Sequence, residues 1–76
     1  MELTDEQHAV LKALRAGERL TSKEVAIDAL LTGSEAAMIL RQLEAGRLAA
    51  RDVDANRGAE VWIITVRGTD LLDAES

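Results

Sequence analysis

The sequence contains no cysteine and only one histidine, His8, among its 76 residues. Without cysteine the chain cannot form a disulfide or a cysteine-ligated metal site, which fits a reducing compartment such as the cytoplasm. One histidine without cysteine supplies neither a zinc cluster nor a nucleophile–base pair. We therefore expect His8 to lie on the surface or edge of a helix, and we expect no metal and no cofactor.

Long apolar runs are also lacking. The longest strongly apolar run, VWIITV at residues 61–66, has the length of a strand and falls far short of the ~20 residues of a membrane span. Asp5, Glu6 and His8 interrupt the N-terminal region, so a signal peptide is not expected. No glycine-rich phosphate loop is present, and the carboxylates are scattered along the chain. These absences predict a cytoplasmic protein that is not an enzyme, with one domain over residues 1–76.

The net charge is −5, which argues against a protein that coats nucleic acid non-specifically. Residues 1–40 carry four basic and seven acidic residues, and residues 58–76 carry one and four, so each of these segments has a charge of −3. Residues 41–57 have a charge of +1, because four arginines outnumber three carboxylates. These arginines are Arg41, Arg47, Arg51 and Arg57. Only this middle segment is not acidic.

Three stretches with the pattern Thr-x-x-Glu/Gln predict three helix starts, at Thr4, Thr21 and Thr32. In such a capping box the threonine hydroxyl accepts a hydrogen bond from the third helical amide, and the Glu or Gln side chain accepts one from the threonine amide. Apolar residues recur at helical spacing after each box. We expect helices over residues 5–16, 22–30 and 33–45, with Gly17 and Gly46 ending the first and the third.

After the third helix the apolar pattern changes from helical to strand-like. Residues 48–53 and 59–64 predict two strands, and the turn-rich residues 54–58 between them predict the tip of a hairpin. We expect a short strand at Arg19–Leu20 to complete the sheet and Thr65 to cap a final short helix. Three helices followed by a hairpin is the order of a winged helix-turn-helix domain, a mainly α fold with a small antiparallel sheet.

Four stretches resemble the winged helix-turn-helix core of MarR-type transcriptional regulators. LTDEQHAVLKAL at residues 3–14 is similar to the opening of that core, and LTSKEVA at residues 20–26 is similar to the entry of its second helix. SEAAMILRQLEAGRLAAR at residues 34–51 is similar to the recognition helix and the exit into the wing, which is the hairpin. ITVRGTDLL at residues 64–72 looks like the family's Leu-Thr-x-x-Gly-x-x-Leu-Leu junction after the wing. The resemblance implies a DNA-binding regulator.

Three features depart from the pattern of this family. MarR-type regulators usually have an additional N-terminal helix and a long C-terminal helix for dimerisation and effector binding. The sequence has neither, so we expect no effector pocket of that kind. Leu30 stands where a turn glycine is common, and Arg47 stands where the glycine after the third helix is common, because Gly46 comes one position early.

The third helix of this fold enters the major groove through its N-terminal half. Its outward positions, taken from the apolar periodicity, are Ser34, Glu35, Ala37, Met38, Arg41 and Gln42. Ser34, Arg41 and Gln42 are suited to base edges, whereas an alanine or a methionine can only contact a thymine methyl or pack against another apolar group. Glu35 would face phosphates unfavourably, and its capping role explains it without any function. For Arg41 and Gln42 the alternative is a solvated helix face.

Four further candidate DNA contacts lie outside the third helix: Lys23, Arg51, Asn56 and Arg57. Arg51 flanks the wing, and Arg57 beside Asn56 at the wing tip is suited to a phosphate or minor-groove contact. For Arg57 the alternative is a loop charge paired with Asp52 or Asp54. Lys23 lies in the first turn of the second helix, which often contacts the DNA backbone. The alternative is that Lys23 is an exposed surface residue without a role in binding.

The strand pattern also bears on the oligomeric state. Trp62 is the only aromatic residue, and strand alternation predicts that it points inward together with Ile64. The same alternation sends Val61 and Ile63 outward, where they predict a partner surface or packing against the C-terminal helix. The candidate contacts of a homodimer are Val61, Ile63, Leu71 and Leu72.

Two hypotheses about function follow. The first is a transcriptional regulator that binds double-stranded DNA, with the third helix in the major groove, and it should show a continuous positive strip from Arg41 across Arg51 to Arg57. The second is a winged-helix protein-interaction module, such as an adaptor, an assembly subunit or an inhibitor, without direct DNA binding. The acidic balance motivates it, and it should show Ala37 and Met38 centred in an exposed apolar patch.

Overall fold

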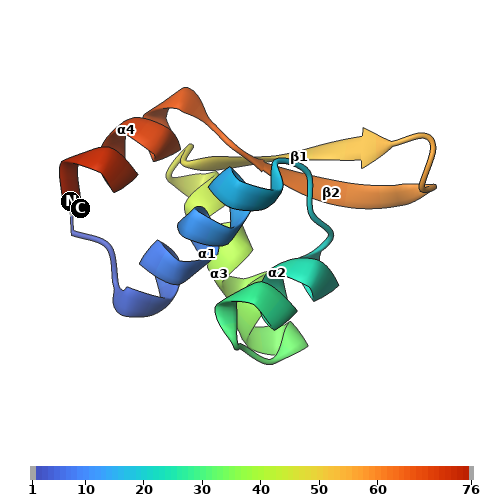
Figure 1. Cartoon of the computed structure of the whole chain (residues 1–76), viewed down its shortest axis with the longest axis horizontal. Helices are drawn as coiled ribbons and strands as arrows, with labels where there is room; N and C mark the ends of the chain where they lie inside the picture. Colours follow the sequence, from blue (N-terminus) through green and yellow to red (C-terminus); the bar gives the residue numbers. More distant parts are fainter. Residues whose placement is uncertain (1, 76) are drawn as a thin grey trace.

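The computed structural model describes residues 2–75, and its first three helices begin at the three predicted capping boxes (Figure 1). Helix α1 spans Asp5–Gly17, α2 spans Ser22–Ala29 and α3 spans Gly33–Ala45. In each box the threonine Oγ1 accepts from the third helical amide at 3.1–3.2 Å, and the Gln or Glu side chain accepts from the threonine amide at 2.9–3.1 Å. Local hydrogen bonding therefore starts each helix, as the sequence predicts.

After each of the first three helices the chain takes a positive φ at a residue other than glycine, namely Glu18, Leu30 and Arg47. Leu30 has a φ of 59° and closes α2, so this helix ends one residue before its predicted boundary. After α3, Gly46 keeps a φ of −85° and Arg47 takes a φ of 62° instead. Both departures from the family pattern are thus L-residues in a conformation that costs about 1–2 kcal/mol per residue.

The wing is an antiparallel hairpin formed by β1, Ala49–Asp54, and β2, Ala59–Ile64. Strand β2 has its predicted bounds. Strand β1 begins one residue later than predicted, because the Leu48 amide donates back to the Leu43 carbonyl at 2.8 Å and so belongs to the turn after α3. In Figure 1 the hairpin extends away from the helices, and its tip lies at the opposite end of the molecule from the two termini.

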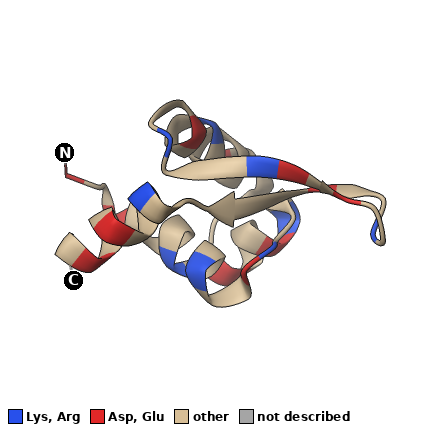
Figure 2. Cartoon of the chain, turned by 90° about the horizontal axis from the view of Figure 1, so that it is seen from above, with Lys and Arg blue, Asp and Glu red and all other residues tan. Residues whose placement is uncertain are grey.

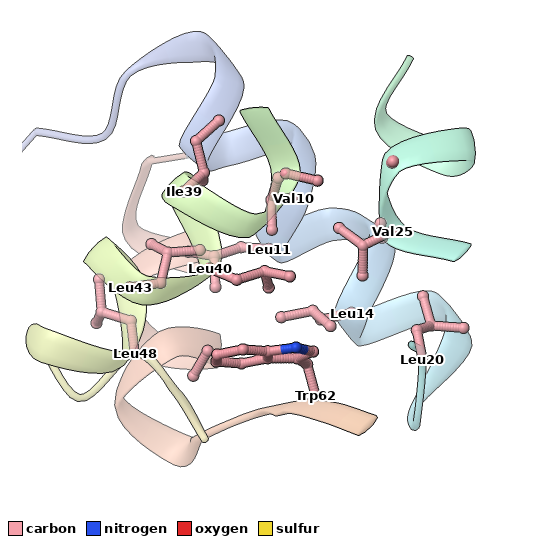
Figure 3. Packing of buried hydrophobic residues seen from close by; sticks show 14 of the residues in the cluster. Val10, Leu11, Leu14, Leu20, Val25, Ile39, Leu40, Leu43, Leu48 and Trp62 are labelled. Carbon is pink, nitrogen blue, oxygen red and sulfur yellow. The ribbon is translucent and has the colours of Figure 1, made fainter. Parts of the chain in front are cut away.

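Strand β2 is covered on both faces near its middle. Leu20 and Trp62 exchange backbone hydrogen bonds of 3.2 and 2.7 Å, so the predicted short third strand is present as a single residue pair. Trp62 is 4% exposed and lies in the core, as predicted (Figure 3). Its neighbour Val61 is fully buried as well, so the prediction that Val61 points outward is wrong. Adjacent strand residues point to opposite faces, and the burial of both shows that each face is covered here.

The core gathers around α1, which contacts α2, α3, α4 and β2. Its inward residues Val10, Leu11 and Leu14 are fully buried, and Figure 3 shows Leu14 beside the ring of Trp62. The remaining large buried side chains are Leu20, Val25, Ile39, Leu40, Leu43, Leu48 and Leu72. Burial of apolar surface from every helix therefore holds the outward face of α3 in a fixed position relative to the wing.

Helix α4, Val66–Glu75, is joined to the wing through Thr65. Thr65 Oγ1 accepts from the Gly68 amide at 3.0 Å and donates to the Arg47 carbonyl at 2.8 Å, so the predicted cap is confirmed and is also bonded to the turn after α3. Gly68 is buried against the Leu48 carbonyl, and a Cβ at this position would overlap that oxygen. The glycine of ITVRGTDLL is therefore required by the close approach of two backbone segments.

Two of the four residues predicted for a homodimer surface are inaccessible. Val61 and Leu72 are fully buried within the chain, so they cannot contact a second copy, and this part of the prediction is wrong. Leu72 belongs to the core because α4 folds back against α1. Ile63 and Leu71 are half-buried and keep part of their side chains at the surface.

Candidate nucleic-acid interface

The outward face of α3 brings together five residues that the sequence singles out on this helix. An open depression on this face is lined by Ser34, Ala37, Met38, Arg41, Gln42 and Ala45. Met38 is 54% exposed, Arg41 and Gln42 are exposed, and Ala37 is half-buried. The face is therefore mixed, with two long polar side chains beside one exposed methionine.

Arg41 and Gln42 differ in whether their side chains contact other residues of the chain. Arg41 has no ion-pair partner among residues 2–75, so its guanidinium is free to contact another molecule. Gln42 Oε1 accepts a hydrogen bond from Gln7 Nε2 at 3.3 Å, which links α3 to the first turn of α1. The side-chain amide nitrogen of Gln42 can still donate two hydrogen bonds.

Glu35 lies at the start of α3 and is held by its capping box. Its Oε1 accepts from the Thr32 amide at 2.9 Å, and this backbone hydrogen bond is the main reason that the pKa of Glu35 is lowered. The carboxylate is thus ionised at neutral pH and stabilised at a helix N-terminus. The negative charge of Glu35 lies next to Ser34 and would repel a nearby phosphate. This agrees with a structural role for Glu35 as a helix cap.

Arg51 on β1 is engaged within the fold. Its Nε lies 2.8 Å from Glu44 Oε2, and its Nη1 lies 3.7 Å from Glu60 Oε2. The guanidinium carbon lies 5.5 Å from the centre of the Trp62 ring, within the range of a cation–π contact. The hydrogen bond to Glu44, followed by the charges of both carboxylates, raises the pKa of Arg51. Arg51 therefore links α3 to both strands, and its charge is offset.

At the wing tip, Asp54 Oδ1 accepts from the Asn56 amide at 3.0 Å, and Asn56 and Arg57 are exposed. Arg57 Nη2 lies 2.8 Å from Glu24 Oε1. The partner of Arg57 is therefore in α2, and the alternative pairing with Asp52 or Asp54 is wrong.

Positive charge on this side of the molecule is interrupted. Lys23 and Arg41 are exposed, and neither has an ion-pair partner in the part of the chain from residue 2 to residue 75. Arg51 and Arg57, by contrast, are paired with carboxylates. Figure 2 shows both basic and acidic residues along the hairpin. The strip expected from Arg41 across Arg51 to Arg57 is therefore not continuous. The apolar patch expected around Ala37 and Met38 is present in part, because Ala45 lies in the same depression together with three polar residues.

Glu24 is the residue of this region that sequence reasoning missed. The sequence assigns it only to a capping box, where its Oε1 accepts from the Thr21 amide at 3.0 Å. The same oxygen also contacts Arg57, and the two interactions, first with Thr21 and then with Arg57, lower the pKa of Glu24. No local signal could reveal this pair, because its two members are far apart in the sequence.

The described residues, 2–75, contain no group of three or more His, Cys, Asp and Glu side chains arranged to hold a metal ion. Within the same range no helix is both long enough and apolar enough to cross a membrane. His8 lies half-buried at the edge of α1, as predicted, in an open groove that also contains Lys12 and Asp28.

Comparison with known proteins gives matches among solved structures only, since no protein-family model and no curated protein matches the chain. A MepR variant of Staphylococcus aureus bound to an oligodeoxyribonucleotide is 33% identical, with a TM-score of 0.84 over 95% of this chain and 54% of that chain. PcaV from Streptomyces coelicolor, a transcriptional regulator in complex with its natural ligand, is 27% identical, with a TM-score of 0.87 over 95% and 52%. BpsR from Bordetella bronchiseptica is 24% identical, with a TM-score of 0.91 over 96% and 53%.

The chain therefore spans about half the length of the structures it matches. A MarR family transcriptional regulator from Silicibacter pomeroyi gives a TM-score of 0.89 at 23% identity, which supports the fold. This likeness agrees with the order of elements in the structure, three helices followed by a wing and a further helix. The chain is thus a winged helix-turn-helix domain that resembles the core of MarR-type transcriptional regulators.

Proposed function

We propose that the protein is a cytoplasmic transcriptional regulator that binds double-stranded DNA. One observation carries the proposal: Ser34, Arg41 and Gln42 are exposed together on α3, the helix that enters the major groove in this fold. Arginine and glutamine can hydrogen-bond base edges there, and Met38 can contact a thymine methyl. The likeness to a MepR variant that was solved with an oligodeoxyribonucleotide supports the assignment.

One chain offers few contacts to the DNA backbone. Lys23 and Arg41 have no internal partner among residues 2–75, and Asn56 and Arg57 extend from the wing tip. Each phosphate contact adds about 0.9 to the slope of log affinity against log salt, so one chain should bind modestly. A homodimer on a palindromic site, with half-sites about one DNA turn apart, would raise the affinity. Ile63 and Leu71 keep some exposed surface for such contacts.

Fluorescence anisotropy of a labelled mixed-sequence duplex at two salt concentrations tests the proposal. We expect binding at about 50 mM salt that weakens by a factor of roughly 10–100 at about 200 mM, as several phosphate contacts require. Arg41→Ala should weaken binding about five-fold or more. The matched control is Arg67→Ala, which removes an exposed cation of α4 that has no ion-pair partner among residues 2–75. Equal losses from both variants, or no binding at about 50 mM, would refute the proposal.

A protein-interaction module without direct DNA binding is the second candidate function. Met38 is 54% exposed, and the pairing of Arg51 and Arg57 with carboxylates reduces the positive charge of the proposed interface. Methionine suits adaptable apolar contacts. In this case Met38→Ala would weaken the binding of a protein partner, Arg41→Ala would leave it largely intact, and the duplex would not bind even at low salt.

A further inference from the structure

One exposed ion pair joins the wing tip to α2. Arg57 Nη2 lies 2.8 Å from Glu24 Oε1, and the two side chains are 41% and 39% exposed. Figure 1 shows that the first turn of α2 and the hairpin lie on the same side of the molecule, away from the termini. Because both side chains are accessible to solvent, another anion can approach Arg57 while the domain stays folded.

The pair involves the wing arginine that has fewer partners within the fold. Arg51 lies between Glu44 and Glu60 and against the Trp62 ring, so it is held at the base of the wing. Arg57 is held by one carboxylate only. A guanidinium uses the same N–H donors for a carboxylate and for a phosphate. A phosphate that approaches Arg57 therefore meets a guanidinium whose Nη2 already contacts a carboxylate, together with the negative charge of Glu24.

We propose that Glu24 competes with DNA phosphate for Arg57 and thereby lowers the affinity of the wing for the DNA backbone. This inference rests on the proposed function, because it concerns the same interface. When DNA binds, Arg57 exchanges the Glu24 carboxylate for a phosphate oxygen, and the carboxylate keeps its capping bond with Thr21 and becomes more exposed to solvent. Recognition then depends more on base contacts from α3 and less on backbone contacts from the wing.

Glu24→Gln removes the competing charge and keeps the helix cap. Glutamine serves this role in α1, where Gln7 Oε1 accepts from the Thr4 amide at 3.1 Å. Glu35→Gln is the matched control, because Glu35 holds the equivalent capping position of α3 and has no ion-pair partner in residues 2–75. Each variant removes one negative charge from the helix-turn-helix, and only Glu24→Gln releases an arginine.

The readout is an anisotropy titration of the same labelled duplex at low salt, with each variant made in the wild type and in an Arg57→Gln background. We expect Glu24→Gln to tighten binding about two- to five-fold, the range open to an exposed ion pair. This gain should disappear in the Arg57→Gln background, because the two residues are then no longer coupled. Any effect of Glu35→Gln should be the same in both backgrounds, since Arg57 pairs with Glu24 and not with Glu35.

The outcomes separate the inference from the proposed function. If Glu24→Gln fails to tighten binding, or tightens it equally with and without Arg57, competition for Arg57 is refuted while DNA binding stands. If neither the wild type nor any variant binds the duplex at low salt, the proposed function fails and the inference fails with it.

Discussion

Gly68→Ala and Gly33→Ala make the same chemical change in two helices and should shift stability in opposite directions. Gly68 is buried in α4, where a Cβ would overlap the Leu48 carbonyl oxygen and lie 2.9 Å from Ile64 Cγ1. At Gly33, the first residue of α3, a Cβ would have no neighbour within 4 Å. The two variants therefore separate the effect of close packing from the effect of backbone entropy.

The loss of stability expected for Gly68→Ala depends on how far the Leu48 carbonyl can move away from the new Cβ. The Leu48 carbonyl accepts from the Thr65 amide at 3.1 Å, so moving it away would also disturb the junction between the wing and α4. Overpacking typically costs about 1–3 kcal/mol and occasionally more, and this constraint places Gly68→Ala at the upper end. The better helix propensity of alanine offsets about 1 kcal/mol. We expect a net loss of about 2 kcal/mol, or roughly 8–16 °C in Tm.

Gly33→Ala lacks the clash and retains the entropic benefit. Reducing the conformational freedom of the unfolded chain should stabilise this variant by about 0.5 kcal/mol. Urea unfolding followed by tryptophan fluorescence measures both variants, because Trp62 is the only aromatic residue and is 4% exposed in the folded state. A shift of the midpoint at constant m-value reports the change in stability. If Gly68→Ala proved as stable as the wild type, the argument that close contact with Leu48 requires a glycine would be refuted.

Two further predictions concern the turn after α2 and the carboxylates bonded to backbone amides. Leu30→Gly should raise the free energy of unfolding by about 0.5–1 kcal/mol, because it relieves left-handed strain at a residue that is 92% exposed. Leu30→Ala keeps the strain and should not raise the free energy of unfolding. Equal urea midpoints for the two variants would count against this explanation. Backbone hydrogen bonds are the largest cause of the lowered pKa values of Glu24, Glu35 and Asp52, so their contribution to stability is complete above the unfolded pKa values and is lost as pH falls through the folded ones. We expect the Tm to be constant above about pH 6 and to decline below about pH 4.5. The decline in Tm should be smaller in the Glu24→Gln, Glu35→Gln double variant. A Tm that stays level down to about pH 3 would contradict the linkage.

The sequence by itself determined the features that depend on neighbouring residues. Thr4, Thr21 and Thr32 each bond to a residue three positions ahead, so the start of each helix could be predicted from four residues. The apolar periodicity of α3 likewise predicted its outward face, because the helical repeat alone decides which side chains share a side. Thr65 was identified as a cap for the same local reason. Whether the residues on that outward face bind DNA stays a prediction.

The tertiary structure decided what contacts each of these local features. Val61 is buried although strand alternation sends it outward, because a period of two distinguishes the faces of a strand and does not reveal that both are covered. The Leu48 carbonyl that requires Gly68 belongs to a distant turn. Arg57 pairs with Glu24 and not with a wing aspartate, since folding brings α2 and the wing tip together. Contacts between residues distant in the sequence thus determine which charges of the candidate interface are free and which are neutralised.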